Sequence, residues 1–268
     1  MSIRIAVKTN VEPVSQVDMV MAACKHYHRS GLVLIAALLF ICNAPAIAAK
    51  QLLFAPFQKI IVLDPGHGGE EIGARGPEGT LEKSVALDLA QILAAELEHR
   101  YKVVLTRTDD SRMRLENRTA AANNLKADLF ISIHTGGSAA HSTSGTTVYH
   151  YQPFSEQTRS LPPAESDTAE NMSGPILWDQ VQSRYVGKSR NIAGLINARL
   201  ITSDAAGESR VAGAPLAVLK GADMPAILIE FGYLTNPADE KALTDKRYLI
   251  SLALAVHQAI DEYFEQEQ

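Results

Sequence analysis

The sequence predicts one α/β domain with a central, mostly parallel, six-stranded sheet flanked by helices. Three observations lead to this prediction. Short runs of aliphatic and β-branched residues alternate with segments of helical periodicity. The length of 268 residues suffices for one large domain or two small ones, and an apolar content of 46% is ordinary for a globular protein. Residues 59–266 are therefore expected to form the domain, without internal repeats.

Six strands are expected, at Lys59–Asp64, Lys102–Thr106, Asp128–Ile133, Gly145–Tyr151, Pro215–Leu219 and Ala226–Glu230. Helical stripes with a 3.6-residue period fill most of the intervals between them. They are anchored by Leu81, Val85 and Leu89; by Leu115, Arg118 and Ala122; by Ile192, Ile196 and Leu200; and by Leu249, Leu252 and Val256. Asn236-Pro237 is expected to be a helix-start turn.

Residues 1–49 are expected to be a signal peptide with an extended amino-terminal region, followed by a linker at 50–58. The continuous apolar run from Gly31 to Cys42 follows basic residues and precedes Ala46-Ile47-Ala48, the order of a secretory leader. About 12 apolar residues fall short of the roughly 20 that span a bilayer, so no stable membrane anchor is expected. Cleavage after Ala48 or Ala49 would leave the protein periplasmic or extracellular.

Charge and cysteine content restrict the partners. The formal net charge is −5, and the leader holds four basic and two acidic residues, so the rest of the chain is more acidic still. Nucleic acid is therefore not expected as a partner. Cys24 and Cys42 both lie in the leader, so the exported chain is expected to have no disulfide and no thiolate ligand.

Three polar residues stand just beyond the carboxyl ends of expected strands. His67 lies in the glycine-rich turn Asp64–Gly69, and His134 and Glu230 each follow an apolar run. Ligands of open α/β sheets bind at this edge. Two imidazoles and a carboxylate suffice for a catalytic zinc with an open position, and a second carboxylate can act as a base. The residues alone leave other roles open, as a turn histidine for His67 and a core histidine for His134.

Glu230 follows Ile227-Leu228-Ile229, and burial of an unpaired carboxylate there would cost several kcal/mol. A metal or a raised pKa would relieve that cost. Glu82 opens a helical stripe, and its spacing alone favours an ordinary solvated helix residue.

Four ordered blocks resemble the zinc-dependent N-acetylmuramoyl-L-alanine amidases, which cut bacterial peptidoglycan. They read LDPGHGGEEIGARGPEGTLEK, LTRTDD, LENRTAAANNLKADLFISIH and PAILIEFGYLTNPADE, within roughly Lys59 to Phe264. The resemblance implies that His67, Glu82 and His134 bind Zn²⁺ and that Glu230 is the catalytic carboxylate. It further implies that peptidoglycan is the substrate, cut between the lactyl group of N-acetylmuramic acid and L-alanine in wall remodelling or daughter-cell separation.

Two other readings remain open beside the amidase. One is a zinc peptidase acting within the stem peptide, and the other is a non-catalytic wall-binding or activator module on the same fold. The acidic charge argues against electrostatic adhesion to anionic wall polymers, so wall contact is expected from the site or from a partner such as an activator protein of the division machinery. One departure from the family stands at Thr135-Gly136-Gly137, where a small residue and then Asn usually follow the histidine.

Some features are expected to be structural or remain undecided. Arg107 and Arg118 are expected to form structural salt bridges, and Asp64 to orient the turn or a ligand. His141, His150 and His257 are expected at the surface. The polar, proline-containing insert 152–186 is expected to be either disordered or a lid docked through Trp178.

Overall fold

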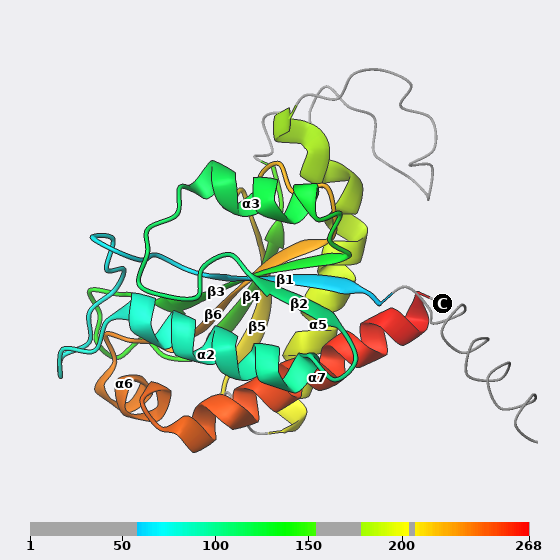
Figure 1. The fold of residues 1–268 in the computed structure, drawn as a ribbon. Coiled ribbons are helices and arrows are strands. Elements are labelled where there is room, and N and C mark those ends of the chain that lie inside the picture. The colour runs from blue at the N-terminus through cyan, green and yellow to red at the C-terminus, as the bar shows by residue number, and fades with distance from the viewer. Residues whose placement is uncertain (1–57, 154–177, 204–206, 268) are drawn as a thin grey trace, which may run out of the picture. The chain divides into compact units, whose positions relative to one another are not determined.

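A computed structural model describes residues 58–153, 178–203 and 207–267 (Figure 1). The described strands form one sheet in the order β2-β1-β3-β6-β4-β5. Their bounds are β1 Ile60–Pro65, β2 Lys102–Leu105, β3 Leu129–Gly136, β4 Thr146–Tyr151, β5 Ser209–Ala214 and β6 Ala226–Tyr233. The helices are α2 Glu82–Leu97, α3 Leu115–Asn124, α5 Val186–Thr202, α6 Pro237–Leu243 and α7 Lys246–Gln266, with the 3₁₀ helix η2 at Trp178–Tyr185. The predicted α/β class, with a mostly parallel six-stranded sheet, is confirmed.

Strand direction brings distant parts of the sequence to one edge of the sheet. Strands β2, β1, β3 and β6 are parallel, so their carboxyl ends share this edge. Strand β4 runs antiparallel to β6, and β5 is parallel to β4. Strands β4 and β5 therefore begin at the edge where β1, β3 and β6 end.

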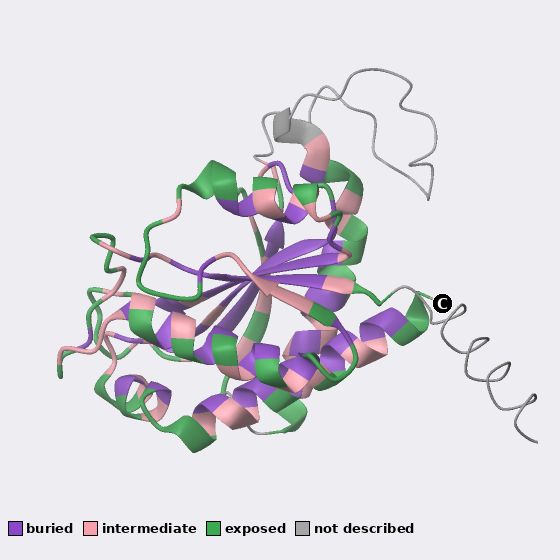
Figure 2. Ribbon diagram, in the orientation of Figure 1, coloured by how far each residue is buried: buried purple, intermediate pink, exposed green. Residues whose placement is uncertain are grey.

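The sheet is covered on both faces, which explains why its central strands are almost wholly apolar. Helices α2, α5 and α7 pack on the face that carries Ile61, Ile131 and Ile229. Helix α3 and the segment 216–224 cover the opposite face, around Phe130 and Leu228. Figure 1 shows α2 and α7 on the side of the sheet away from α3, and Figure 2 shows the central strands as the most buried part of the chain.

The prediction of a strand at Pro215–Leu219 is wrong, because this segment forms consecutive turns after β5 ends at Ala214. Its apolar residues Val218 and Leu219 are buried as turn residues against the sheet. The true strand was missed because β5 is half-exposed at the edge and contains small residues, which weakens the alternating apolar pattern.

The predicted helix start at Asn236-Pro237 is confirmed. The Asn236 side chain accepts hydrogen bonds from the amides of Ala238 and Asp239, and Pro237 opens α6. The leader, most of the 50–58 linker and residues 154–177 of the insert lie outside the described residues, so the lid prediction is not tested. In the described part of the chain, no helix has the length and apolar character that crossing a membrane requires.

Candidate metal centre and catalytic site

The turn after β1 holds His67 in an unusual conformation. His67 has φ +59°, a left-handed value that is uncommon for residues other than glycine. The amide of Gly66 donates to the Ile133 carbonyl at 2.9 Å, which joins the turn to β3. A Cβ on Gly66 would lie 2.3 Å from the His134 ring, so only glycine lets the two chains approach so closely.

Two buried arginine side chains donate hydrogen bonds to the backbone of this turn. Arg107 donates to the carbonyls of Pro65 at 3.0 Å, Gly66 at 2.7 Å and Lys83 at 2.8 Å, and also to that of Asp109. It thus links the backbone around His67 to the first turn of α2. The prediction of a salt bridge is wrong for Arg107, because its hydrogen-bond partners are carbonyls. A planar guanidinium with five donors suits several oxygens at once.

The salt-bridge prediction is confirmed for Arg118. Its guanidinium donates to the fully buried Asp64 at 2.8 Å and to the His67 carbonyl at 3.0 Å. Asp64 also accepts hydrogen bonds from Thr106 and Ser132. Its carboxylate therefore orients the turn, as predicted.

Glu82 is the first residue of α2 and is only 4% exposed, so the prediction from spacing of a solvated helix residue is wrong. Its carboxylate accepts hydrogen bonds from the amides of Ala74 at 2.7 Å and Thr135 at 3.1 Å. The loop that precedes α2 folds back over this side chain, and the Glu82 amide donates to the Ala74 carbonyl. Burial of Glu82 thus depends on a local loop, not on helical periodicity.

The carboxylate of Glu82 joins the two histidines. Nε2 of His67 lies 3.1 Å from one of its oxygens, and Nδ1 of His134 lies 2.9 Å from the other. Burial would raise the pKa of Glu82, but hydrogen bonds from His134 and His67 lower it well below its usual range. The same contact with Glu82 raises the pKa of His67, against the opposing effect of burial.

The geometry of these three side chains fits a metal ion. One ligand atom from each of His67, Glu82 and His134 can be chosen so that all lie within 4.8 Å of one another. Among the described residues, Nδ1 of His67 makes no hydrogen bond of good geometry, and it lies 3.3 Å from a carboxylate oxygen of the exposed Glu71. A Cβ on Gly73 would lie 2.4 Å from the Glu82 carboxylate and 2.6 Å from the His67 ring, so the backbone encloses the cluster closely. Two imidazoles and a carboxylate are a ligand set used by catalytic zinc.

Glu230 lies beside this cluster. It is the register partner of His134, on the adjacent strand β6, and Tyr149 of β4 donates to its carboxylate at 3.3 Å. Burial raises the pKa of Glu230, and this effect outweighs the lowering by His134 and Tyr149. A half-buried carboxylate with a raised pKa is a stronger base than an ordinary carboxylate, which suits it to accept a proton and to return it.

The departure at Thr135-Gly136-Gly137 has a structural reason. A Cβ on Gly136 would lie 2.7 Å from the ring of Tyr233, so the aromatic ring occupies the space that a side chain would need. The backbone amide of Thr135 still reaches Glu82. The metal cluster is therefore compatible with glycine at 136.

Glu240, in the first turn of α6, was missed by the sequence reasoning. It is 2% exposed, and its carboxylate accepts from the amides of Glu78 at 2.9 Å and Thr80 at 3.1 Å. A Cβ on Gly76 would lie 2.2 Å from it. We call Glu240 with its two amide donors the loop latch, since it fixes the segment between His67 and Glu82. The sequence signal that could have identified Glu240 is its position in the motif NPADE, which follows the strand that contains Glu230.

The other histidines lie apart from this cluster. His141 is exposed, as predicted, and its ring contacts the Thr235 carbonyl. His150 was predicted at the surface but is 4% exposed, because β4 is covered on both faces. His257 is partly buried on α7, 3.5 Å from Asp261.

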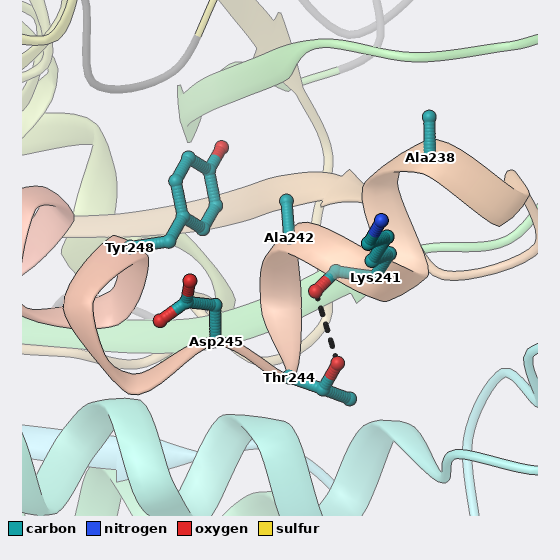
Figure 3. A pocket seen from close by; sticks show the side chains of 6 residues that line it. All are labelled: Ala238, Lys241, Ala242, Thr244, Asp245 and Tyr248. Atoms are coloured by element: carbon teal, nitrogen blue, oxygen red, sulfur yellow. Dashed lines mark hydrogen bonds between the residues drawn. The ribbon is translucent and has the colours of Figure 1, made fainter.

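A pocket between α6 and α7 contains none of the four predicted site residues (Figure 3). It is lined by Ala238, Lys241, Ala242, Thr244, Asp245 and Tyr248.

A family profile and two curated relatives connect the chain to N-acetylmuramoyl-L-alanine amidases. Residues 61–262 match the sequence profile of the N-acetylmuramoyl-L-alanine amidase family Amidase_3. The chain is 33% identical to N-acetylmuramoyl-L-alanine amidase AmiC of Neisseria meningitidis, over 76% of the chain and 52% of that protein. It is 31% identical to AmiC of Escherichia coli over the same shares. The chain therefore spans about half the length of these curated relatives.

Solved structures give the same picture. Amidase AmiC2 of Nostoc punctiforme is 28% identical with a TM-score of 0.62, over 77% of this chain and 97% of that one. An amidase from Clostridium difficile 630 is 25% identical with a TM-score of 0.63, over 79% of this chain and 99% of that one.

Proposed function

Because the chain belongs to the N-acetylmuramoyl-L-alanine amidase family Amidase_3, we propose that it is a zinc-dependent peptidoglycan amidase. It would hydrolyse the amide bond between the lactyl group of N-acetylmuramic acid and L-alanine of the stem peptide. The reaction would serve wall remodelling or daughter-cell separation. His67, Glu82 and His134 would hold the zinc, and Glu230 would be the catalytic carboxylate.

One observation carries this proposal. The three ligand atoms converge within 4.8 Å, and the partly buried carboxylate of Glu230 stands at the adjacent register position to His134. A ligand cluster without a neighbouring base would fit a structural metal equally well. The pair of features, at the carboxyl edge of the sheet, is what a metal-assisted hydrolase requires.

The position of each side chain indicates its role in the reaction. Zinc bound by the three side chains would supply a Lewis acid that polarises the substrate carbonyl and acidifies water. Glu230 accepts the proton of the attacking water, and its raised pKa keeps that proton available for return. It then delivers the proton to the nitrogen of L-alanine as the amide bond breaks. Tyr149 holds the Glu230 carboxylate in place through its hydroxyl.

The products test this function directly. A purified disaccharide peptide incubated with the zinc-loaded protein should yield a sugar with a free lactyl carboxyl group and a peptide with a free L-alanine amino terminus. Release of D-alanine would instead support a zinc peptidase acting within the stem. Binding of peptidoglycan without any cleavage would support a non-catalytic wall-binding or activator module.

Export and partners are further parts of the proposal. The leader sequence supports cleavage after Ala48 or Ala49 and a periplasmic or extracellular location. Mass spectrometry of protein from the envelope should find an amino terminus at Ala49 or Lys50, and an intact amino terminus on cytoplasmic protein would contradict it. One similar structure is the CwlD amidase of Clostridioides difficile in complex with the GerS lipoprotein. A protein partner on a similar domain supports the proposal that an activator protein binds this chain.

A further inference from the structure

A row of polar side chains crosses the sheet from the metal centre to the edge strand β5. His134 is the register partner of Glu230, Glu230 of Thr147, and Thr147 of Arg210. Side chains at partnered positions project from the same face of a sheet. Since neighbouring strands lie about 4.8 Å apart, the backbone of Arg210 is roughly 10 Å from that of Glu230.

Arg210 is the unpaired cation of this row. Its side chain is exposed, and within the described ranges it makes no hydrogen bond or ion pair. Thr147 lies between Arg210 and Glu230 and is 1% exposed. Arg210 is therefore the solvent-exposed end of the row.

The strand order gives the direction of the substrate, on the basis of the proposed function. The metal ligands come from the β1 and β3 side of the site, and Glu230 stands on the β6 side. The carbonyl of the scissile amide must face the metal, and the leaving nitrogen must face Glu230, which protonates it. The peptide that begins at this nitrogen therefore continues past Glu230 toward β4 and β5, where Arg210 lies.

In a stem peptide whose second residue is a glutamyl residue, an acid stands in the matching place. Its α-carboxyl group carries a negative charge when it is free and none when it is amidated. At about 3.5 Å per extended residue, this group lies roughly 7 Å from the scissile nitrogen. We propose that Arg210 binds the free α-carboxylate of the second stem residue and makes the enzyme prefer the acidic stem over the amidated one. A guanidinium matches a carboxylate with two parallel hydrogen bonds.

The test uses two synthetic disaccharide peptides that differ only in this group, as a carboxylate or a carboxamide. The parental protein should cleave the acid with a kcat/KM about tenfold higher than that for the amide. This ratio is expected for one charge-assisted contact at a partly solvated site. Arg210→Gln should bring the acid-to-amide ratio of kcat/KM to about one, through a rise in the KM for the acid. Arg210→Lys should retain part of it.

The matched control is Arg190→Gln, an exposed arginine on α5, whose helix packs on the opposite face of the sheet. It should keep the parental preference. An unchanged preference in Arg210→Gln, or an equal fall on both substrates, would overturn the proposal for Arg210 while cleavage at L-alanine still supports the amidase. If the parental protein cleaves neither substrate at L-alanine, the proposed function fails, and this proposal fails with it.

Discussion

Replacement of Arg107 by lysine tests whether the structure beneath the site sets the affinity for zinc. Arg107 is 3% exposed and donates to four carbonyls, which belong to the turn of His67, to the start of α2 and to Asp109. Lysine keeps the charge but offers three donors from a single point. It can satisfy at most part of this set.

The magnitude follows from the lost contacts. If lysine leaves two of the four carbonyls unpaired, at about 1.5 kcal/mol for each charge-assisted bond, the free energy of unfolding falls by about 3 kcal/mol. Because the turn and α2 carry His67 and Glu82, the zinc affinity should also fall, by about 10- to 100-fold, as for other groups that orient metal ligands.

Two measurements separate the effects. Chemical denaturation of the metal-free protein gives the stability, and competition with a chelator of known affinity gives the zinc Kd. The control is Arg199→Lys, whose surface ion pair with Glu262 should be worth less than about 1 kcal/mol and should not affect zinc. A variant Arg107→Lys that is less stable but binds zinc with the parental affinity would refute the positioning role.

Three further predictions concern individual positions. Glu230→Gln should retain zinc and the fold but lose about 10²- to 10⁴-fold in kcat, and parental turnover of peptidoglycan would show that Glu230 is not the base. Gly73→Ala should lose zinc in elemental analysis, whereas Gly207→Ala, at a similar positive φ but in open space, should keep it; equal zinc in both would contradict the close approach. Burial would raise the pKa of Glu240, but its amide partners lower it below the usual value of 4.5. The loop latch therefore stabilises the fold fully above about pH 4.5, and this stabilisation is lost as the pH falls through the lower pKa of the folded state. In urea titrations, Glu240→Gln should therefore lower the free energy of unfolding by about 2 kcal/mol at pH 7. The variant should also lose less stability than the parental protein between pH 5 and pH 3. The same loss of stability with acid in both proteins would exclude the loop latch.

The residues at strand ends were predictable because the rule that places them is simple. A buried parallel strand is a continuous apolar run, and the residue after it emerges at the ligand-binding edge. His67, His134 and Glu230 all follow such runs, and His67 lies beyond the end of β1 as predicted. The prediction of strand ends is wrong for His134 and Glu230, because backbone pairing extends β3 to Gly136 and β6 to Tyr233, and both residues lie in the last half of their strands.

Residues that depend on a folded loop were not predictable from local pattern. Glu82 is buried by Ala74, in the loop that precedes α2, and by Thr135 on β3, and both meet it only after this loop folds back over its side chain. Only the family resemblance pointed to it. Glu240 lies 160 residues from Thr80, and no periodicity links a helix residue to a loop so far away in sequence.

Packing against the sheet also explains why the sequence pattern gave the wrong position for β5. Val218 and Leu219 have the apolar character of a strand but pack as a turn, whereas Ser209–Ala214 forms the strand through backbone pairing with β4. Edge strands are specified by their partner's hydrogen bonds as much as by side chains, so their own sequence carries a weaker signal.

The metal content of three proteins tests the central claim, that the fold joins His67, Glu82 and His134 into one zinc centre served by Glu230. After reconstitution and removal of loosely bound metal, elemental analysis should find one zinc per chain in the parental protein and in Glu230→Gln. It should find none in His134→Ala, with circular dichroism confirming that the variant is folded. Full zinc occupancy in folded His134→Ala, or absence of zinc from the parental protein, would contradict the account.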